Sequence, residues 1–322
     1  MNCLKTVLVG VDFSPCSEGA FRQAARVAAW NGAALSALHV IALPAYVPTP
    51  HRFISFDLPT QADFVPAARA QWERFASGCD AAAGVTLDIE IGSPRERILD
   101  RVLRDKPDLL VLGSHSVLDA AKGVGPTAAA LVQGAATKVL LVRAGHAGAF
   151  RNIVACIDFT DTSLLALEQA IRTATQDDAA LHVLHVYDDP WCGWTPPAGH
   201  PANMPDHQEQ YRRAVQDRLR AFCEPLAHEF KSRSPVFHVI ESEWRGGGYG
   251  HAVVAFVKRN GCDLAVLGTR AKWNLRDFLW GSTAERVVRS AHCSILAVKS
   301  REVHHGRATD ERSGTVREPL VA

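Results

Sequence analysis

The sequence predicts an α/β protein built from two tandem domains, each a doubly wound, Rossmann-like parallel sheet of five strands. Three observations carry this prediction. The chain has 322 residues, which is more than one hydrophobic core usually serves. The sequence repeats itself across its two halves. Within each half, short β-branched runs alternate with helical stretches, the pattern of parallel strands joined by right-handed crossovers.

The repeat is visible in ordered blocks. The segment Thr6–Ser14 returns as Asn152–Thr160, so that Asp12 corresponds to Asp158, a shift of 146 residues. Later in the chain the block Asp108–Gly113 returns as Asp263–Gly268, a shift of 155. Because the blocks keep their order and the gaps fall between them, the chain is a duplication.

The first copy shows the expected elements in order. Its strands are short and apolar on both faces, as in a sheet covered by helices on both sides. The first helix places Phe21, Ala24 and Ala28 at helical spacing, with Ser14 or Ser17 as candidate N-caps. The predicted strands are 6–11, 35–41, 86–91, 109–112 and 139–142, and the predicted helices are 17–30, 67–82, 96–104 and 127–135.

The composition is that of an ordinary globular protein. It is 47% hydrophobic, and 35 basic against 34 acidic residues give a net charge of +1, which argues against dedicated nucleic-acid or membrane-surface binding. No apolar run approaches the ~18–20 residues of a membrane span, and Met1–Asp12 reads as a strand rather than a signal peptide. The eight cysteines show no CxxC or zinc spacing. We therefore expect reduced thiols and a cytoplasmic location.

The domain boundaries follow from the repeat. Residues 1–146 form the first domain, residues 150–300 the second, and the polar, unpatterned residues 301–322 a disordered tail. Two proline-rich stretches interrupt the pattern after the second strand of each copy, at Leu43–Pro66 and Asp188–Asp206. They are interpreted as irregular surface excursions, with a lid or a partner-docking loop as the alternative.

The candidate site lies where open parallel sheets bind ligands, beyond the carboxyl ends of the strands. In the second copy this edge carries Asp158, Val186 and Gly268, and further on a glycine that opens the last helix. Free N–H groups at a helix start suit a phosphate, whereas Asp158 suits a ribose hydroxyl or a magnesium ion. The candidate binding residues are Asp158, Val186, Gly268, Thr269, Ala271, Gly281, Ser282 and Thr283.

These motifs resemble the universal stress protein family. The resemblance rests on Asp-Phe-Ser/Thr after strand 1, Leu-His-Val in strand 2, and a loop of the form G-x2-G-x9-G-[ST], and it spans about residues 3–144 and 150–300. It implies an adenine-nucleotide alpha-hydrolase-like fold and a loop that cradles the phosphates of ATP, with or without Mg2+. It also implies an aspartate near the nucleoside and an intrachain pseudo-dimer through the fifth strands, with a further homodimer left open.

Both copies depart from that loop pattern. In the second copy the second glycine is Ala271, whose methyl weakens binding if the position needs a positive φ or close phosphate approach. The first copy reads Gly113-Ser114-His115-Ser116, and only eight residues separate Ser116 from Gly125-Pro126. Pro126 removes a backbone N–H that a phosphate would use. The first domain is therefore expected to be degenerate. For Gly281–Thr283 the alternative is an ordinary helix N-cap.

Other motifs carry weaker signals. The glycine-rich run Arg245–His251 lacks the Gly-Lys-Ser/Thr of a P-loop and is predicted to be a flexible loop. His39 and His185 are interpreted as satisfied core histidines, and Cys156 as a small buried side chain rather than a redox sensor. The basic stretch from Arg270 to Arg276 is interpreted as a solvated loop.

Three functional hypotheses are consistent with these sequence features. The favoured one is a cytoplasmic stress-response protein that binds adenine nucleotide in its second domain and responds through ligand-linked stabilisation of one conformation. The second is a nucleotide-independent module that binds a protein partner or a lipid-like ligand. The third is an enzyme, either an ATPase or an adenylate-transferring member of the same superfamily. Any ATP hydrolysis is expected to be slow, because the sequence offers no recognisable nucleophile, base or paired carboxylates.

Overall fold

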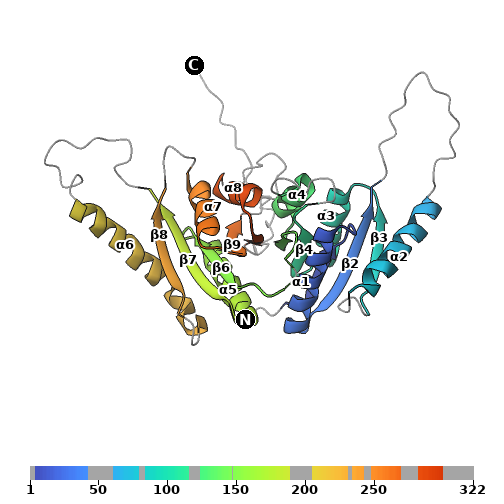
Figure 1. Ribbon diagram of the computed structural model, residues 1–322, viewed down its shortest axis with the longest axis horizontal. Coiled ribbons are helices and arrows are strands. Elements are labelled where there is room, and N and C mark those ends of the chain that lie inside the picture. The colour runs from blue at the N-terminus through green and yellow to red at the C-terminus, as the bar shows by residue number, and fades with distance from the viewer. Residues whose placement is uncertain are drawn as a thin grey trace, which may run out of the picture.

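The chain forms two α/β halves whose sheets join into one ten-stranded sheet (Figure 1). The strand order is β3-β2-β1-β4-β5-β10-β9-β6-β7-β8. The computed structural model describes residues 4–42, 61–79, 84–115, 124–146, 148–188, 205–230, 234–242, 248–269 and 282–299.

Each half supplies five parallel strands with helices between them. The first half comprises β1 (Thr6–Gly10), α1 (Pro15–Asn31), β2 (Ala34–Ile41), α2 (Gln61–Ser77), β3 (Leu87–Ile91), α3 (Pro94–Asp105), β4 (Leu109–Gly113), α4 (Pro126–Gly134) and β5 (Lys138–Val142). The second half comprises β6 (Asn152–Ile157), α5 (Asp161–Asp177), β7 (Ala180–Tyr187), α6 (Pro205–Cys223) with the 3-10 helix Glu224–Phe230, β8 (Val236–Glu241), α7 (Tyr249–Arg259), β9 (Leu264–Thr269), α8 (Ser282–Ser290) and β10 (Ser294–Lys299). The predicted five strands per copy are confirmed.

The first helix of each half begins and ends on the same kind of signal. Ser14 caps α1 by accepting a hydrogen bond from the N–H of Ser17 at 3.1 Å, and Thr160 caps α5 from Ser163 at 3.2 Å. At the other end, Gly32 closes α1 in the left-handed conformation, φ 63°. These signals determine where both helices begin and where α1 ends.

The helices cover both faces of the sheet. One face carries α1, α2, α5 and α6, over a core that includes Phe21 and Leu167. The other carries α3, α4, α7 and α8, over a core that includes Leu131 and Ile295. This is the doubly wound arrangement that the alternating pattern predicted.

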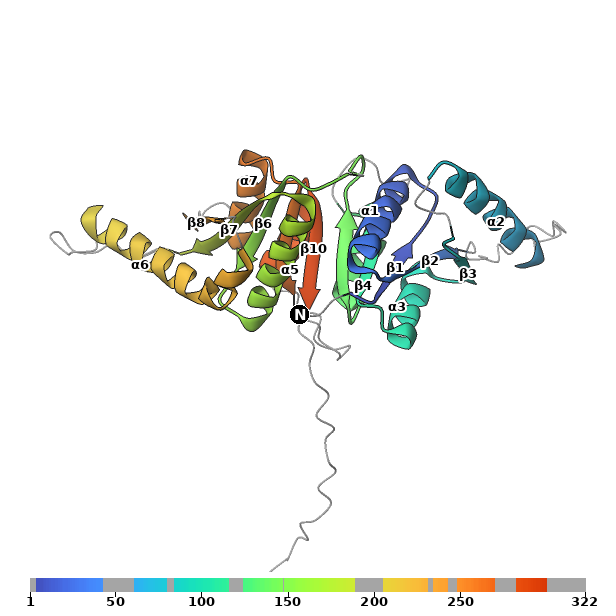
Figure 2. The same ribbon diagram turned by 90° about the horizontal axis from the view of Figure 1, so that it is seen from below.

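The two halves meet at their fifth strands, as the resemblance implied. β5 and β10 pair antiparallel, with Leu140 opposite Leu296, and lie side by side at the centre of the molecule (Figure 2). Lys299 strengthens this junction, because its Nζ donates to the carbonyl oxygens of Gln133 at 3.1 Å and of Ala135. This buried Nζ thus caps the carboxyl end of a helix in the other half, and burial lowers the pKa of Lys299 to about 7.

Several sequence-based boundaries need correction. The helix predicted at 67–82 begins at Gln61 and includes Pro66, so the excursion 43–66 ends earlier than expected. A proline at the sixth position of a helix removes one backbone hydrogen bond and crowds the preceding turn. The packing of Trp72 and Phe75 against Phe21, with ring centroids 5.6 and 5.7 Å away, offsets that cost. In the second half α6 begins at Pro205, so its first two residues fall within the predicted excursion.

The glycine-rich run is also corrected. Gly248 is the N-cap of α7 with φ 74°, so Tyr249, Gly250 and His251 are helical rather than part of a loop. Residues 243–247 lie outside the described residues, as do the bulk of both excursions, the basic stretch and the tail.

Candidate functional site

The candidate site sits at the carboxyl edge of the second half, where three neighbouring strands end together. β6 pairs with β7 on one side and with β9 on the other. Continued past the last printed pairs, the register brings Asp158 beside Val186 and one residue beyond the level of Gly268. The connections that leave β6 and β9 run to opposite faces of the sheet, which makes this the topological switch point. Three of the predicted site residues therefore come together.

The Asp158 side chain is exposed at this edge and held in place by its own turn. Its Oδ1 accepts hydrogen bonds from the Thr160 N–H at 3.1 Å and the Thr160 hydroxyl at 2.5 Å. Among the residues that the structure describes, its Oδ2 accepts none. The turn thus presents one carboxylate oxygen toward the space beyond the sheet, as a ribose hydroxyl or a hydrated cation would require.

The residue between Asp158 and Thr160 has a strained backbone conformation. Phe159 has φ 60°, a conformation that non-glycine residues rarely adopt. Its ring lies 4.3 Å from the imidazole of His185 and under the guanidinium of Arg218 at 4.2 Å. Phe159 belongs to the Asp-Phe-Thr motif, but neither its packing role nor Arg218 could be recognised from the sequence, since nothing in the spacing indicates that α6 reaches this turn.

His185 plays the structural part expected of it. Its Nδ1–H donates to the carbonyl oxygen of Ile157 at 2.8 Å, and His39 makes the equivalent bond to Val11 at 2.7 Å. Burial lowers the pKa of His185, and the charge of Arg218 acts in the same direction. The neutral ring holds β7 to the end of β6 beside Asp158.

Gly268 and Thr269 have structural reasons for their identity. A Cβ on Gly268 would lie 3.0 Å from the carbonyl carbon of Thr162 and 3.1 Å from the nitrogen of Ser163, so glycine lets the start of α5 approach β9. The side chain of Thr269 is 6% exposed, with its hydroxyl directed at the Val298 carbonyl at 3.4 Å. Gly268 serves helix packing whether or not a ligand binds, and the Thr269 hydroxyl is already engaged.

The start of α8 completes the described part of the site. Ser282 is the first residue of the helix and Thr283 the second, with Thr283 half-buried. The carbonyl of Thr283 lies 3.1 Å from where a Cβ of Gly250 would be, so α7 and α8 pack closely here. Ala271 and Gly281 lie outside the described residues.

The described part of the corresponding loop in the first half offers fewer main-chain donors. The N–H of Gly125 donates to the carbonyl oxygen of Ser114 at 2.8 Å, and Pro126, the first residue of α4, has no N–H. Two main-chain donors that would face a phosphate are therefore unavailable. Asp12 nevertheless repeats the turn of Asp158, accepting from the N–H and hydroxyl of Ser14 at 3.0 and 2.5 Å.

Cys156, next to the site, has a thiol that favours the protonated form. Burial raises the pKa of the Cys156 thiol to about 12, helped by the neighbouring Cys293 and Cys262, so the thiol stays protonated near neutral pH.

Across the described residues, no group of three or more His, Cys, Asp and Glu side chains is placed to hold a metal ion. None of the described helices is both long and apolar enough to span a bilayer.

Comparison with known proteins identifies the family. The profile of the universal stress protein family matches residues 4–143 and 149–299. A universal stress protein of Mycolicibacterium smegmatis is 25% identical over 311 residues, 92% of this chain and 97% of its own. One from Methanocaldococcus jannaschii is 31% identical over 151 residues, 47% of this chain and 82% of its own.

The fold agrees with this match. A solved Pseudomonas aeruginosa protein of unknown function superposes with a TM-score of 0.60 at 17% identity, covering 92% of each chain. A universal stress protein of Archaeoglobus fulgidus gives 0.57 at 16% identity, covering 91% of this chain and 96% of its own. The chain belongs to the universal stress protein family and carries two copies of its domain in tandem.

Proposed function

We propose that the second domain binds an adenine nucleotide, ATP with Mg2+, at the edge formed by β6, β7 and β9. The observation that carries this proposal is the position of Asp158, an exposed and preorganised carboxylate at the switch point, one residue beyond the level of Gly268. Asp158 would accept from the ribose or hold a hydrated Mg2+, and Val186 would lie against the base. The N–H groups that open α8, with the hydroxyls of Ser282 and Thr283, would receive the phosphates.

The first domain would serve as the structural partner. Its Gly125 N–H is engaged and Pro126 has none, so its loop offers fewer donors to a phosphate. Nucleotide binding by the second domain would then stabilise one conformation of the pair, which unidentified protein partners would recognise in the cytoplasm during stress. We propose a regulatory role with no catalysis, and turnover well above ~1 s⁻¹ would contradict it.

A matched pair of variants tests the site. We expect ATP with Mg2+ to bind the intact chain in calorimetry, Asp158→Ala to weaken the affinity about ten-fold or more, and Asp12→Ala to leave it unchanged. Asp12 makes the same capping contacts as Asp158, so both variants lose similar local stability and differ only in the domain affected.

Two outcomes would contradict the proposal. One is the absence of heat at millimolar ATP with Mg2+ together with no nucleotide in mass spectra of the freshly purified chain. The other is a loss of affinity in Asp12→Ala that equals the loss in Asp158→Ala. The first outcome would leave the nucleotide-independent module as the better description of this protein.

A further inference from the structure

The outer side of β8 offers an unpaired strand edge. β8 is the last strand at one end of the sheet, and no described strand lies beyond it (Figure 1). The N–H of Ser242, just after β8, donates to the carbonyl oxygen of Tyr187 in β7 at 2.8 Å. Because successive residues of a strand direct their main-chain groups to alternate sides, Phe237, Val239 and Glu241 direct theirs away from β7. Another strand can therefore pair with β8 along this side.

β8 lacks the charges that protect the opposite end of the sheet. There the edge strand β3 carries Asp88 and Glu90, and charged side chains on an edge strand discourage further pairing. In β8 the equivalent positions hold His238 and Ile240. None of the six β8 residues is buried, and Val236, at 52% exposed, is the most exposed large hydrophobic side chain among the described residues. An exposed, apolar edge of this kind is typical of an interaction site.

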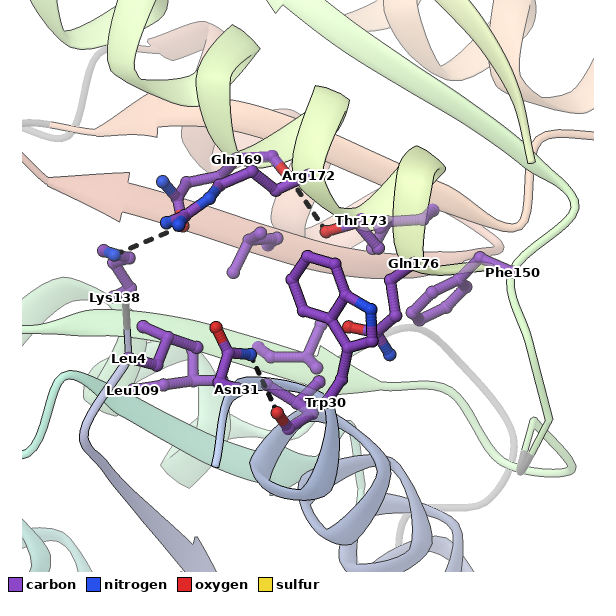
Figure 3. A pocket seen from close by; sticks show the side chains of 14 residues that line it. Leu4, Trp30, Asn31, Leu109, Lys138, Phe150, Gln169, Arg172, Thr173 and Gln176 are labelled. Carbon is purple, nitrogen blue, oxygen red and sulfur yellow. Dashed lines mark hydrogen bonds between the residues drawn. The ribbon is translucent and has the colours of Figure 1, made fainter. Parts of the chain in front are cut away.

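A groove lies beside this edge, between β8 and α7. It encloses about 310 Å³, at the lower end of the size range of ligand pockets. The crevice between α1 and α5 encloses only about 50 Å³, and Lys138 there already donates to Gln169 Oε1 at 3.2 Å (Figure 3). Of these two spaces, the groove therefore has room for the side chains of a ligand. Its lining includes Ile240 and Glu241 from β8 and Ala252, Ala255, Phe256 and Arg259 from α7.

The repeat explains why the groove contains an unpaired cation. In the first half, Arg104 of α3 reaches across to Glu90 of β3 at 3.4 Å. The repeat places Arg259 where α3 has Arg104, and the register places Ile240 where β3 has Glu90. Arg259 therefore lacks the carboxylate that its counterpart binds. Within the described residues, its guanidinium makes no hydrogen bond or ion pair.

Two alanines widen the groove. Ala252 and Ala255 occupy the positions at which α3 carries Arg97 and Asp100, an ion pair with a separation of 3.9 Å. Alanine fills less space than either of those side chains. Phe256, which is buried, lines the groove with its ring. The groove thus joins an apolar surface to one unpaired guanidinium.

We propose that this groove binds an extended segment of a partner protein, which adds antiparallel to β8 as an eleventh strand. The segment would carry an apolar side chain and, two residues further along, a carboxylate. Because alternate residues of a strand face the same side, the apolar side chain would lie against Ile240 and Phe256 while the carboxylate pairs with Arg259. Main-chain hydrogen bonds would supply affinity and the two side chains specificity. None of the lining residues belongs to the candidate nucleotide site, so the proposal does not depend on nucleotide binding.

A second copy of the chain fits the groove less well. Antiparallel pairing of two β8 strands would keep the same face of each strand on the same side of the sheet, as it does for β5 and β10. The second copy would then present Val236, His238 and Ile240 to the groove, and none of these offers a carboxylate to Arg259. The unpaired guanidinium therefore favours a different partner.

The test uses the full chain without nucleotide and three fluorescein-labelled heptapeptides. The first, Ser-Thr-Leu-Thr-Asp-Thr-Ser, carries the proposed pattern. The second has Asn in place of Asp, which removes the charge that Arg259 would bind, and the third has Pro in place of the threonine between Leu and Asp, which removes a main-chain donor. We expect fluorescence anisotropy to show micromolar binding of the first peptide and about ten-fold weaker binding of the other two.

Two variants of the chain give Arg259 a carboxylate of its own. Ile240→Glu places the residue that β3 has at this position, and Ala255→Asp places the one that α3 has. Each should weaken binding of the first peptide about ten-fold and remove its advantage over the second. Ala255 is exposed on α7, so this variant is expected to fold whether or not a charge is tolerated at position 240. Lys258→Gln removes a neighbouring exposed charge and should leave all three affinities unchanged.

Four results would overturn the proposal. The first is no binding of the first peptide at about 1 mM. The second is equal affinity of the intact chain for the first peptide and either of the other two. The third is an affinity for the first peptide that survives Ala255→Asp. The fourth is sedimentation showing that the chain dimerises and that Ile240→Glu abolishes the dimer, which would make a second copy the occupant of this edge.

Discussion

The two outer edges of the ten-stranded sheet occupy equivalent places and are built from different chemistry. In the first half, Arg101 of α3 bonds Asp88 of β3 and Asp105, and lies 3.7 Å from Glu90. Burial raises the pKa of Asp105, but hydrogen bonds from Arg104 and Arg101 outweigh it and leave that pKa below its usual value. This edge is a network of ion pairs.

The second edge carries aromatic side chains at the positions where the first edge carries charged ones. The register places His238 of β8 where β3 has Asp88, and the repeat places Phe256 where α3 has Arg101. One ring nitrogen of His182 donates to or accepts from His238 at 3.0 Å, and the His238 and Phe256 rings are 4.8 Å apart. The same backbone thus accepts either chemistry, so each edge can be perturbed separately.

The largest expected difference comes from removing the central side chain of each edge. Phe256 is buried, and Phe256→Ala should lower the free energy of unfolding by about 3–4 kcal/mol through lost burial and the cavity that remains. Arg101→Ala should lower it by about 1 kcal/mol, because its partners can turn to water. Urea unfolding of the two variants measures both values. Equal losses would mean that the ion pairs bear as much of the stability as the aromatic packing.

The second largest difference should appear when the pH is lowered, because the stabilities of the two edges depend on pH differently. Burial lowers the pKa of His182, and burial together with His182 lowers that of His238, so the unfolded chain binds protons that the folded edge resists. The stability they contribute is complete above the unfolded value near 6.5 and is lost as the pH falls below it. Asp105, with its lowered pKa, loses its contribution only below its unfolded value near 3.8.

Hydrogen exchange at pH 7 and pH 5 measures this difference strand by strand. β8 should lose protection at pH 5 while β3 keeps it. Because burial also lowers the pKa of His146 and His185, the variant His182→Gln with His238→Gln is needed to isolate this edge. An unchanged response of β8 in that double variant would show that the pair does not cause the acid sensitivity.

Most of the fold could be predicted because it depends on short-range sequence patterns and on the internal repeat. Five strands per half and the capping residue Ser14, one of two candidates, follow from short-range signals. The start of α2 could not be predicted, since the helix continues through Pro66 on the strength of contacts with Phe21, distant in sequence. The cap that Lys299 provides to α4 also depends on how the halves meet.

The candidate site could be predicted only in outline. Sequence reasoning identified Asp158, Val186 and Gly268 as neighbours because strand order alone brings them to one edge. It did not reveal that Gly268 is needed for the approach of α5, nor that Arg218 covers Phe159, because both follow from packing between helix and turn. The engaged N–H of Gly125 similarly needs the loop geometry.

The smallest predicted effect concerns salt. In a double-mutant cycle, Asp88→Ala and Arg101→Ala should couple by about 0.5–1 kcal/mol at low ionic strength, because the pair is partly screened by water. That coupling should shrink in 1 M NaCl, where the Debye length is about 3 Å. The equivalent cycle of His238→Ala and Phe256→Ala should not respond to salt, since neutral rings make the contact. Salt dependence of equal size at both edges would remove the chemical distinction drawn between them.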